Sequence, residues 1–245
     1  MTSQRSNNAL VEIREILMQG QKDLATAYLA RPDHKAYLVG RAQLVDHVLK
    51  QLWLHEQMPK GSALIAVGGY GRNELYPHSD IDVLIALESP ATPEQETVLA
   101  RMVSQFWDIG LAVGHSVRTI DECITAAESD VTVQTALSES RLICGQKALY
   151  QQMQQAINVC MDHGQFIAAK LAEQEERHQR HAFSAFSLEP NCKESPGGLR
   201  DLQVILWVAK AAGLGTSWEN LGRKGLATEF EVKQLKRNED ALALI

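Results

Sequence analysis

The sequence predicts an α+β protein in which a small mixed sheet with flanking helices lies between helical amino- and carboxy-terminal segments. Apolar residues three and four apart, the spacing of a helix that buries one face, dominate both ends of the chain. Between them, within residues 62–120, three short apolar runs alternate with helical stretches. We therefore divide the chain into an amino-terminal helical segment at 1–60, a core at 61–128 and a carboxy-terminal helical domain at 129–245.

The amino-terminal segment predicts two helices. "ALVEIREIL" and "AYLVGRAQLVDHVLKQLWLHEQM" both show helical spacing, and Arg31-Pro32 separates them because a proline disfavours helical backbone in the residue before it. Pro59-Lys60-Gly61 ends the second helix. The core then begins with "SALIAVGG", which predicts a buried strand that ends in glycines.

Three further elements complete the predicted core. "DIDVLIAL" predicts a second strand, and "ETVLARMVSQFWDIG" an amphipathic helix that Gly110 closes. "LAVGHSVRT" predicts a third strand, followed by a helix that opens at Thr119 or Asp121. From Asp130 onward nearly all of the chain predicts helix, with one clear interruption at "SLEPNCKESPGGLRDLQ".

The helical parts allow three smaller predictions. Trp53, Trp107 and Trp207 lie on apolar helical stripes, so we expect them in the core. The run "QEERHQRH" at 174–181 predicts a solvated helix face rather than a binding patch. The chain stops at "NEDALALI", within a helical pattern and without a cap, so we expect a piece of a longer protein.

Composition excludes several classes of protein. Of the 245 residues 45% are hydrophobic and 22% charged, which is ordinary for a globular protein. The net charge of −6 argues against a nucleic-acid partner. The four cysteines, scattered with no C-x-x-C, favour a reduced, cytoplasmic protein. The amino terminus lacks the apolar core of a signal peptide, and no apolar run is long enough to cross a membrane.

The stretch "VGGYGRNELYPHSDIDVL" carries the candidate chemistry. Residues two apart share a face of a strand, so Asp80 and Asp82 point the same way while Ile81 and Val83 point into the core. Two carboxylates this close raise each other's pKa unless a cation lies between them. Hard oxygen ligands favour Mg²⁺, with Mn²⁺ as the alternative, and a pair of such ions can clamp the oxygens of a phosphoryl transfer.

The double glycine upstream fits the same chemistry. Gly68 and Gly69 have no side chains, so a triphosphate could come close to their backbone N–H groups. "YGRNEL" after them could form a short helix, with Arg72 as a phosphate ligand, and Ser79 next to Asp80 joins the nucleotide-binding candidates. Each feature alone is more often a plain turn or a strand end that faces water, but their order and spacing favour a site.

The combination of Gly-Gly, about ten residues and Asp-x-Asp resembles the nucleotidyltransferase superfamily of DNA polymerase β. "GGYGRNELYPHSDIDVL", "VGHSVRT" and "KESPGGLRDLQVILWVAK" together resemble the amino-terminal part of the bacterial PII uridylyltransferase family, and "PGGLRDLQ" is its most specific motif. Asn73 and Ser195 stand where that family leads us to expect glycine, and Tyr76 where we expect phenylalanine.

The resemblance implies a fold like that of the polymerase β nucleotidyltransferases and a two-metal transfer of UMP from UTP to a tyrosine hydroxyl of the PII protein, with release of pyrophosphate. It also implies further domains in the family, a His-Asp hydrolase-type domain that removes UMP and ACT domains that sense glutamine. The chain has no His-Asp dipeptide, so we expect no uridylyl-removing activity from it.

Several assignments stay open. Many members of the superfamily use a third carboxylate on the next strand, but "LAVGHSVRT" offers only His115, Ser116 and Arg118. Asp121 or Glu122 could reach the metals, although both suit a helix start, and His115 is as readily structural as substrate-binding.

A second region with open assignments is the "PGGLRDLQ" motif. Lys193 and Arg200 flank Pro196-Gly197-Gly198 and could bind a nucleotide phosphate, with Asp201 to orient Arg200 or to cap the helix.

Two alternatives to the uridylyltransferase remain. The same fold could serve another base or acceptor, as in a protein adenylyltransferase or a small-molecule nucleotidyltransferase, because the motifs contact only phosphate and metal. A nucleotide-binding regulatory module without turnover is the second alternative.

Overall fold

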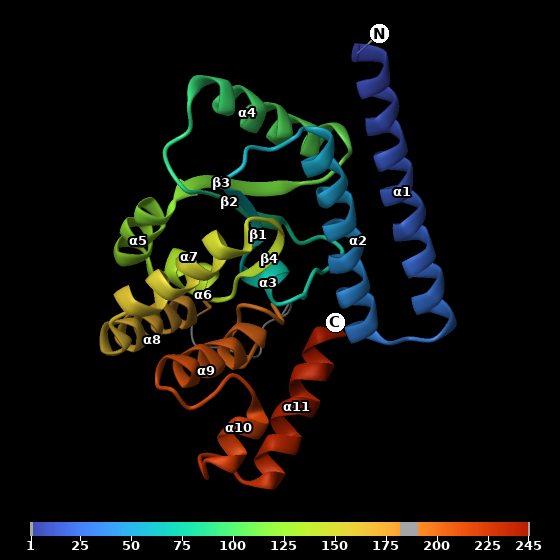
Figure 1. The fold of residues 1–245 in the computed structure, drawn as a ribbon. Helices are drawn as coiled ribbons and strands as arrows, with labels where there is room; N and C mark the ends of the chain where they lie inside the picture. The colour runs from blue at the N-terminus through green and yellow to red at the C-terminus, as the bar shows by residue number, and fades with distance from the viewer. Residues whose placement is uncertain (1, 182–190, 245) are drawn as a thin grey trace. The chain divides into compact units, whose positions relative to one another are not determined.

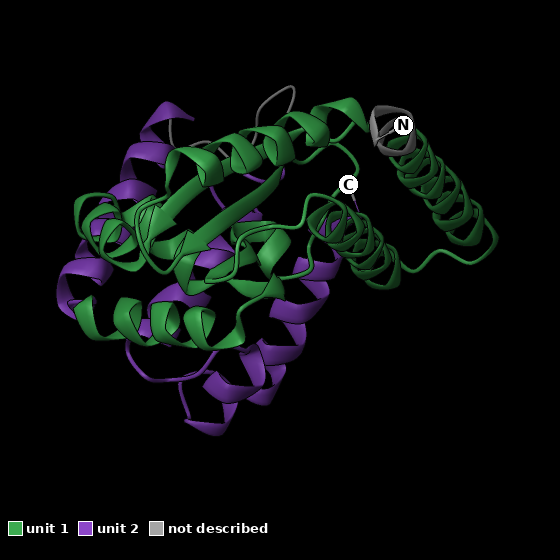
Figure 2. Ribbon diagram, turned by 45° about the horizontal axis from the view of Figure 1, so that its top comes forward, with its two compact units in different colours: residues 1–160 green, residues 161–245 purple. Residues whose placement is uncertain are grey.

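The structure, a computed structural model, describes residues 2–181 and 191–244, with side chains from residue 8 onward. The chain forms two compact units, residues 1–160 and residues 161–245 (Figure 2). The elements of the first unit are α1 (Thr2–Ala30), α2 (His34–His55), β1 (Ser62–Ala66), α3 (Gly68–Gly71), β2 (Ile81–Leu87), α4 (Pro93–Asp108), β3 (Val113–Thr119), α5 (Ile120–Ser129), α6 (Val131–Ser138), β4 (Arg141–Gly145) and α7 (Lys147–Cys160) (Figure 1). Those of the second are α8 (His163–Arg180), α9 (Leu199–Ala211), α10 (Trp218–Arg223) and α11 (Glu229–Ala243).

The four strands form one mixed sheet in the order β3-β2-β1-β4. β1 runs antiparallel to both β2 and β4, and β3 runs parallel to β2. The predicted small mixed sheet with flanking helices is therefore confirmed, as are its three predicted strands. The fourth strand, β4, differs from the prediction of nearly continuous helix after residue 130. Five residues, "RLICG", are too few for periodicity to distinguish a strand from a helix.

The strand β4 pairs with β1 through Leu64↔Cys144, Ile65↔Leu142 and Ala66↔Arg141. These pairs join residues far apart in the sequence, so no local pattern could have predicted the strand.

Each face of the sheet carries its own apolar core. One core joins alternate residues of β2, namely Ile81, Val83, Ile85 and Leu87, to buried residues of α1, α2 and α4. The other core joins Ala63 and Ile65 of β1 and Leu84 and Ala86 of β2 to buried residues of α5, α6 and α7. Figure 2 shows helices of the first unit on both faces of the sheet. The sheet is therefore buried on both sides, and polar side chains are confined to its ends and edges.

The predicted helix boundaries follow local capping. Asp33 caps α2, and its carboxylate accepts a hydrogen bond from the Ala36 N–H at 3.0 Å, so the predicted break at Arg31-Pro32 is confirmed. Thr119 caps α5 and accepts from the Glu122 N–H at 3.3 Å, which confirms that the helix after the third strand opens at this threonine.

Two of the three tryptophans predicted in the core are buried. Trp53 is 8% exposed and Trp207 is 6% exposed. Trp107 is 59% exposed, so its prediction is wrong. The stripe of α4 that packs on the sheet contains Met102 and Phe106, and the residue after Phe106 is rotated by about 100° away from it.

The second unit, as far as the structure describes it, is helical. Its α8 contradicts the prediction of a fully solvated face at 174–181, because Arg177 is only 3% exposed and Gln174 and His178 bind Asp201. Glu175, Glu176, Gln179 and Arg180 are exposed, as expected. Within the described residues, no helix combines the length and the apolar character needed to cross a membrane.

Candidate functional site

The aspartate pair lies at the beginning of β2. Asp80 directly precedes the strand, and Asp82 is its second residue. Both are exposed, whereas Ile81 is 5% exposed and Val83 is 2% exposed. The predicted alternation is confirmed, because the two carboxylates face solvent while their neighbours enter the core.

The double glycine is held beside this strand. The N–H of Val67 donates to the carbonyl of Asp82 at 3.1 Å, which joins the end of β1 to the aspartates. The short helix α3 begins at Gly68 itself, two residues before the start predicted at Tyr70. Gly68 has a φ of +58°, which other residues adopt at a cost, and a Cβ there would meet nothing within 4 Å. Open space therefore surrounds the first glycine.

A third glycine, missed in the sequence analysis, lies next to Asp82 on the neighbouring strand. Gly114 pairs with Asp82 in the parallel register of β2 and β3. A Cβ at Gly114 would lie 2.5 Å from Oδ1 of Asp82, which is too close for any real contact. The missing side chain therefore leaves room for the carboxylate. A glycine inside a predicted strand, where it weakens the strand, was the signal that could have found it.

The register also places the polar residues of β3. Ser116 pairs with Leu84 and Arg118 with Ala86, so both lie on the same face as Asp82. His115 pairs with Val83 and lies on the opposite face. Substrate binding by His115 beside the aspartates is therefore not supported by the register.

Among the residues that the structure describes, no third carboxylate is grouped with Asp80 and Asp82. Glu122 accepts from the backbone N–H of Thr119 at 2.8 Å, as expected of a helix start. The described parts of the chain contain no group of three or more His, Cys, Asp or Glu residues that could hold a metal ion. Asp80 and Asp82 form a pair, which fits Mg²⁺ because this ion often takes one or two carboxylates and fills its other positions with water and substrate phosphate oxygens.

The other candidates beside the aspartates have protein partners. Arg72 forms ion pairs with Glu139 and, at 2.8 Å, with Glu74. Burial alone would lower the pKa of Arg72, but the two carboxylates outweigh it and raise that pKa, so the guanidinium stays charged. The hydroxyl of Ser79 donates to the carbonyl of Tyr76 at 3.0 Å and closes the turn before Asp80. A phosphate contact of Arg72 or Ser79 stays a prediction.

The "PGGLRDLQ" motif forms a tight loop at the start of α9. Gly197 has a φ of +81°, and a Cβ on Gly198 would lie 2.7 Å from the carbonyl oxygen of Cys192. The N–H groups of Leu199 and Arg200 donate to the carbonyls of Cys192 and Lys193, each at 2.9 Å. These two amides of the first helical turn are therefore engaged within the loop.

Asp201 connects this loop to α8. It accepts from the Gly197 N–H at 2.7 Å and from Gln174 at 2.9 Å, and it also contacts Arg177 and His178. Burial alone would raise the pKa of Asp201, but these hydrogen bonds outweigh it and lower that pKa. The expectation that Asp201 orients Arg200 is not met, since the partners of Arg200 are Gln203, Glu194 and the ring of Trp207. The side chain of Lys193 is exposed.

The sequence has clear relatives. The family described as GlnD PII-uridylyltransferase matches residues 165–245, and the one described as a nucleotidyltransferase domain matches residues 48–134. Two relatives are named bifunctional uridylyltransferase/uridylyl-removing enzyme. The one from Aromatoleum aromaticum is 45% identical to this chain over 93% of its residues, and the one from Cupriavidus pinatubonensis is 48% identical over 86% of them. The chain is a relative of the PII uridylyltransferases. It covers 26% and 24% of the two enzymes, about a quarter of their length.

Two of the three departures from the uridylyltransferase motifs, those at Asn73 and Ser195, have structural explanations. Asn73 has a φ of +63°, a conformation in which glycine is best and asparagine is among the better substitutes. Ser195 is 7% exposed, and its hydroxyl accepts a hydrogen bond from the Asn191 N–H at 3.2 Å. The serine therefore adds a side-chain hydrogen bond to the loop, which a glycine could not make. Neither departure alters the aspartate pair.

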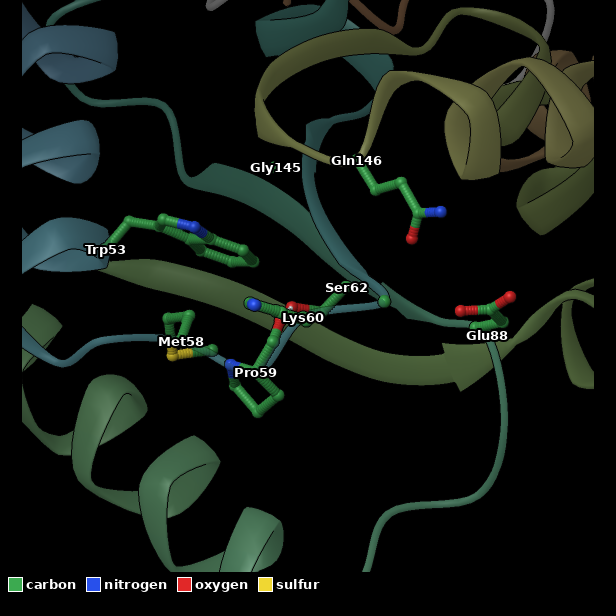
Figure 3. A pocket seen from close by; sticks show the side chains of 9 residues that line it. Trp53, Met58, Pro59, Lys60, Ser62, Glu88, Gly145 and Gln146 are labelled. Atoms are coloured by element: carbon green, nitrogen blue, oxygen red, sulfur yellow. Dashed lines mark hydrogen bonds between the residues drawn. The ribbon is translucent and has the colours of Figure 1, made fainter.

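A pocket of about 490 Å³ lies away from the nucleotidyltransferase motifs. Its lining includes Trp53, Lys60, Ser62, Glu88 and Gln146 (Figure 3). Trp53 belongs to α2, and the other four residues lie around the start of β1 or just beyond the ends of β2 and β4, whereas the aspartates lie at the start of β2. The chemistry of the motifs, rather than the volume of this pocket, therefore identifies the candidate site.

Proposed function

We propose that this chain is the nucleotidyl-transferring part of a PII uridylyltransferase and that it transfers UMP from UTP to a tyrosine hydroxyl of the PII protein. The observation that carries the proposal is the exposed pair Asp80 and Asp82, with Gly68-Gly69 held beside it, in a chain similar to enzymes of that name. Pyrophosphate is the second product.

Asp80 and Asp82 would hold Mg²⁺, or Mn²⁺ in its place. When bound, a divalent ion neutralises phosphate charge and lowers the pKa of a coordinated hydroxyl. The space that Gly114 leaves beside Asp82 allows that carboxylate to keep its position at the strand. The open surroundings of Gly68 allow a phosphate to approach the backbone.

The transfer forms one bond and breaks another. The tyrosine oxygen bonds to the α-phosphorus of UTP, the bond from that phosphorus to the oxygen shared with the β-phosphate breaks, and the phenolic proton is released. In this proposal Arg72 and Ser79 contact the nucleotide, with Arg72 first exchanging a carboxylate partner. Phosphate binding by Lys193 and Arg200 stays a prediction from the sequence. A cytoplasmic location, and the lack of nucleic-acid and membrane partners, remain predictions from the sequence.

The test is Mg²⁺-dependent labelling of a PII protein by UTP. Asp80→Asn and Asp82→Asn should each abolish labelling without lowering the melting temperature, because both side chains are exposed. Asp108→Asn, which removes an exposed carboxylate at the end of α4, is the matched control and should label normally. Labelling that persists in both variants would contradict the assignment of the aspartates.

The alternative is the same fold with another base or acceptor. The geometry described involves phosphate and metal contacts, so it does not distinguish UTP from other nucleotides. Thermal shifts with UTP, ATP, CTP and GTP in the presence of Mg²⁺ would separate the candidates, since a tighter ligand stabilises the fold more. The largest shift should come from UTP, and one from ATP would favour an adenylyltransferase.

A further inference from the structure

The back of the Gly68-Gly69 turn is held by a buried polar cluster. Tyr70, the next residue, is 1% exposed, and its hydroxyl donates to Oδ1 of Asp46 at 2.6 Å. Arg141 donates to both carboxylate oxygens of Asp46, at 2.5 Å and 3.0 Å. A nitrogen of Arg141 also lies 3.4 Å from the carbonyl oxygen of Tyr70, and its guanidinium lies 5.4 Å from the centre of the tyrosine ring. Side chain and backbone of Tyr70 are thus both restrained.

The charges of the cluster suit this arrangement. Burial and the neighbouring Asp46 raise the pKa of Tyr70, so the phenol keeps its proton and remains a donor. Burial alone would lower the pKa of Arg141, but its bonds to Asp46 outweigh this effect and keep it charged. A hydrogen bond between a charged and a neutral group in a buried setting is stronger than one between neutral groups.

Helix α2, which carries Asp46, also holds the chain between the Gly68-Gly69 turn and the aspartates. Nε of Arg41 donates to the carbonyl of Leu75 at 3.2 Å, and Nη2 donates to that of Pro77 at 3.2 Å. Arg41 and Asp46 both belong to α2, so one helix restrains both ends of the segment between the glycines and the aspartates. Arg41, Asp46 and Arg141 all lie outside residues 48–134, the range matched by the nucleotidyltransferase domain.

We infer that Asp46, Tyr70 and Arg141 are positioning residues that fix the Gly68-Gly69 turn relative to Asp80 and Asp82 for nucleotide binding. The inference rests on the proposed function for its kinetic consequence, but its structural part is independent of activity. The helix α2 and the strand β4 then serve the site although the matched domain contains neither Asp46 nor Arg141.

The test compares Tyr70→Phe and Asp46→Asn with Glu56→Gln. Glu56 is the control, because it is a 7% exposed carboxylate at the C-cap of α2 that binds Arg101 and Gln105. Tyr70→Phe and Asp46→Asn should raise the KM for UTP about tenfold and leave the KM for PII unchanged, since the lost bond involves a charged acceptor. Glu56→Gln should leave both values unchanged.

Hydrogen exchange gives a second readout that needs no turnover. The N–H groups of Gly71, Arg72 and Glu74 close the turn through bonds of 2.9–3.1 Å. Their exchange should become faster in Tyr70→Phe and Asp46→Asn but not in Glu56→Gln. Unchanged exchange at these amides, or an unchanged KM for UTP in both variants, would overturn the inference. Faster exchange in a protein that never labels PII would contradict only the proposed function.

Discussion

Gly114→Ala should separate activity from stability. The added methyl would lie 2.5 Å from Oδ1 of Asp82, so the carboxylate must retreat by about 0.9 Å to reach the 3.4 Å of an ordinary contact. Asp82 is exposed and can move at little cost to the fold. A misplacement of about 1 Å at a reacting centre can cost about 100-fold in rate, so we expect labelling to slow by about that factor.

The expected effect on stability has the opposite sign. Replacing glycine by alanine at a compatible backbone position raises the free energy of unfolding by about 0.4–1 kcal/mol, because the unfolded chain loses freedom. Labelling rate by intact-mass spectrometry and melting temperature by calorimetry measure the two effects. Gly164→Ala in α8, whose Cβ would lie 3.4 Å from its nearest neighbour, is the matched control. Full activity in Gly114→Ala, or a parallel loss of activity and stability, would refute the reasoning.

Three further predictions concern the fold. Trp207→Ala should lower the free energy of unfolding by about 3–5 kcal/mol in denaturant titration, whereas Trp107→Ala, at a 59% exposed position, should change it little. Asn73→Gly should raise the melting temperature slightly, because glycine accepts the φ of +63° without strain; a fall would contradict this. Asp201→Asn should destabilise the second unit by about 3–5 kcal/mol, since buried Arg177 loses the nearer of its two charged partners, Asp201 and Glu194. Because the pKa of Asp201 lies below its ordinary 3.8, its contribution is fully present above that pH and is lost as the pH falls through the lower folded pKa, so the gap between wild type and variant should close in acid.

Local patterns were sufficient to predict the aspartates and the double glycine. Asp80 and Asp82 interrupt an apolar run at a spacing of two, and Gly68-Gly69 ends the preceding one. Their position at neighbouring strand ends follows from the strands alone. By contrast, Gly114 becomes meaningful only once the register places it opposite Asp82, and a single sequence does not give that register.

The remaining differences also come from tertiary contacts. β4 depends on pairing with β1, and the bonds of Tyr70 to Asp46 and of Arg141 to Asp46 span 24 and 95 residues. Besides the backbone N–H of Gly197 in its own motif, Asp201 binds side chains of α8. A charged residue in a helical pattern is usually exposed, so the burial of Arg177 could not be predicted without knowing where the Asp201 loop packs.

The most direct test of the central claim is incubation of the chain with a PII protein, Mg²⁺ and each of UTP, ATP, CTP and GTP, followed by intact-mass spectrometry of PII. The account predicts a mass gain equal to UMP with UTP alone, located on a tyrosine, and none in Asp80→Asn or Asp82→Asn. A gain from another nucleotide, or a gain from UTP that survives both substitutions, would contradict it.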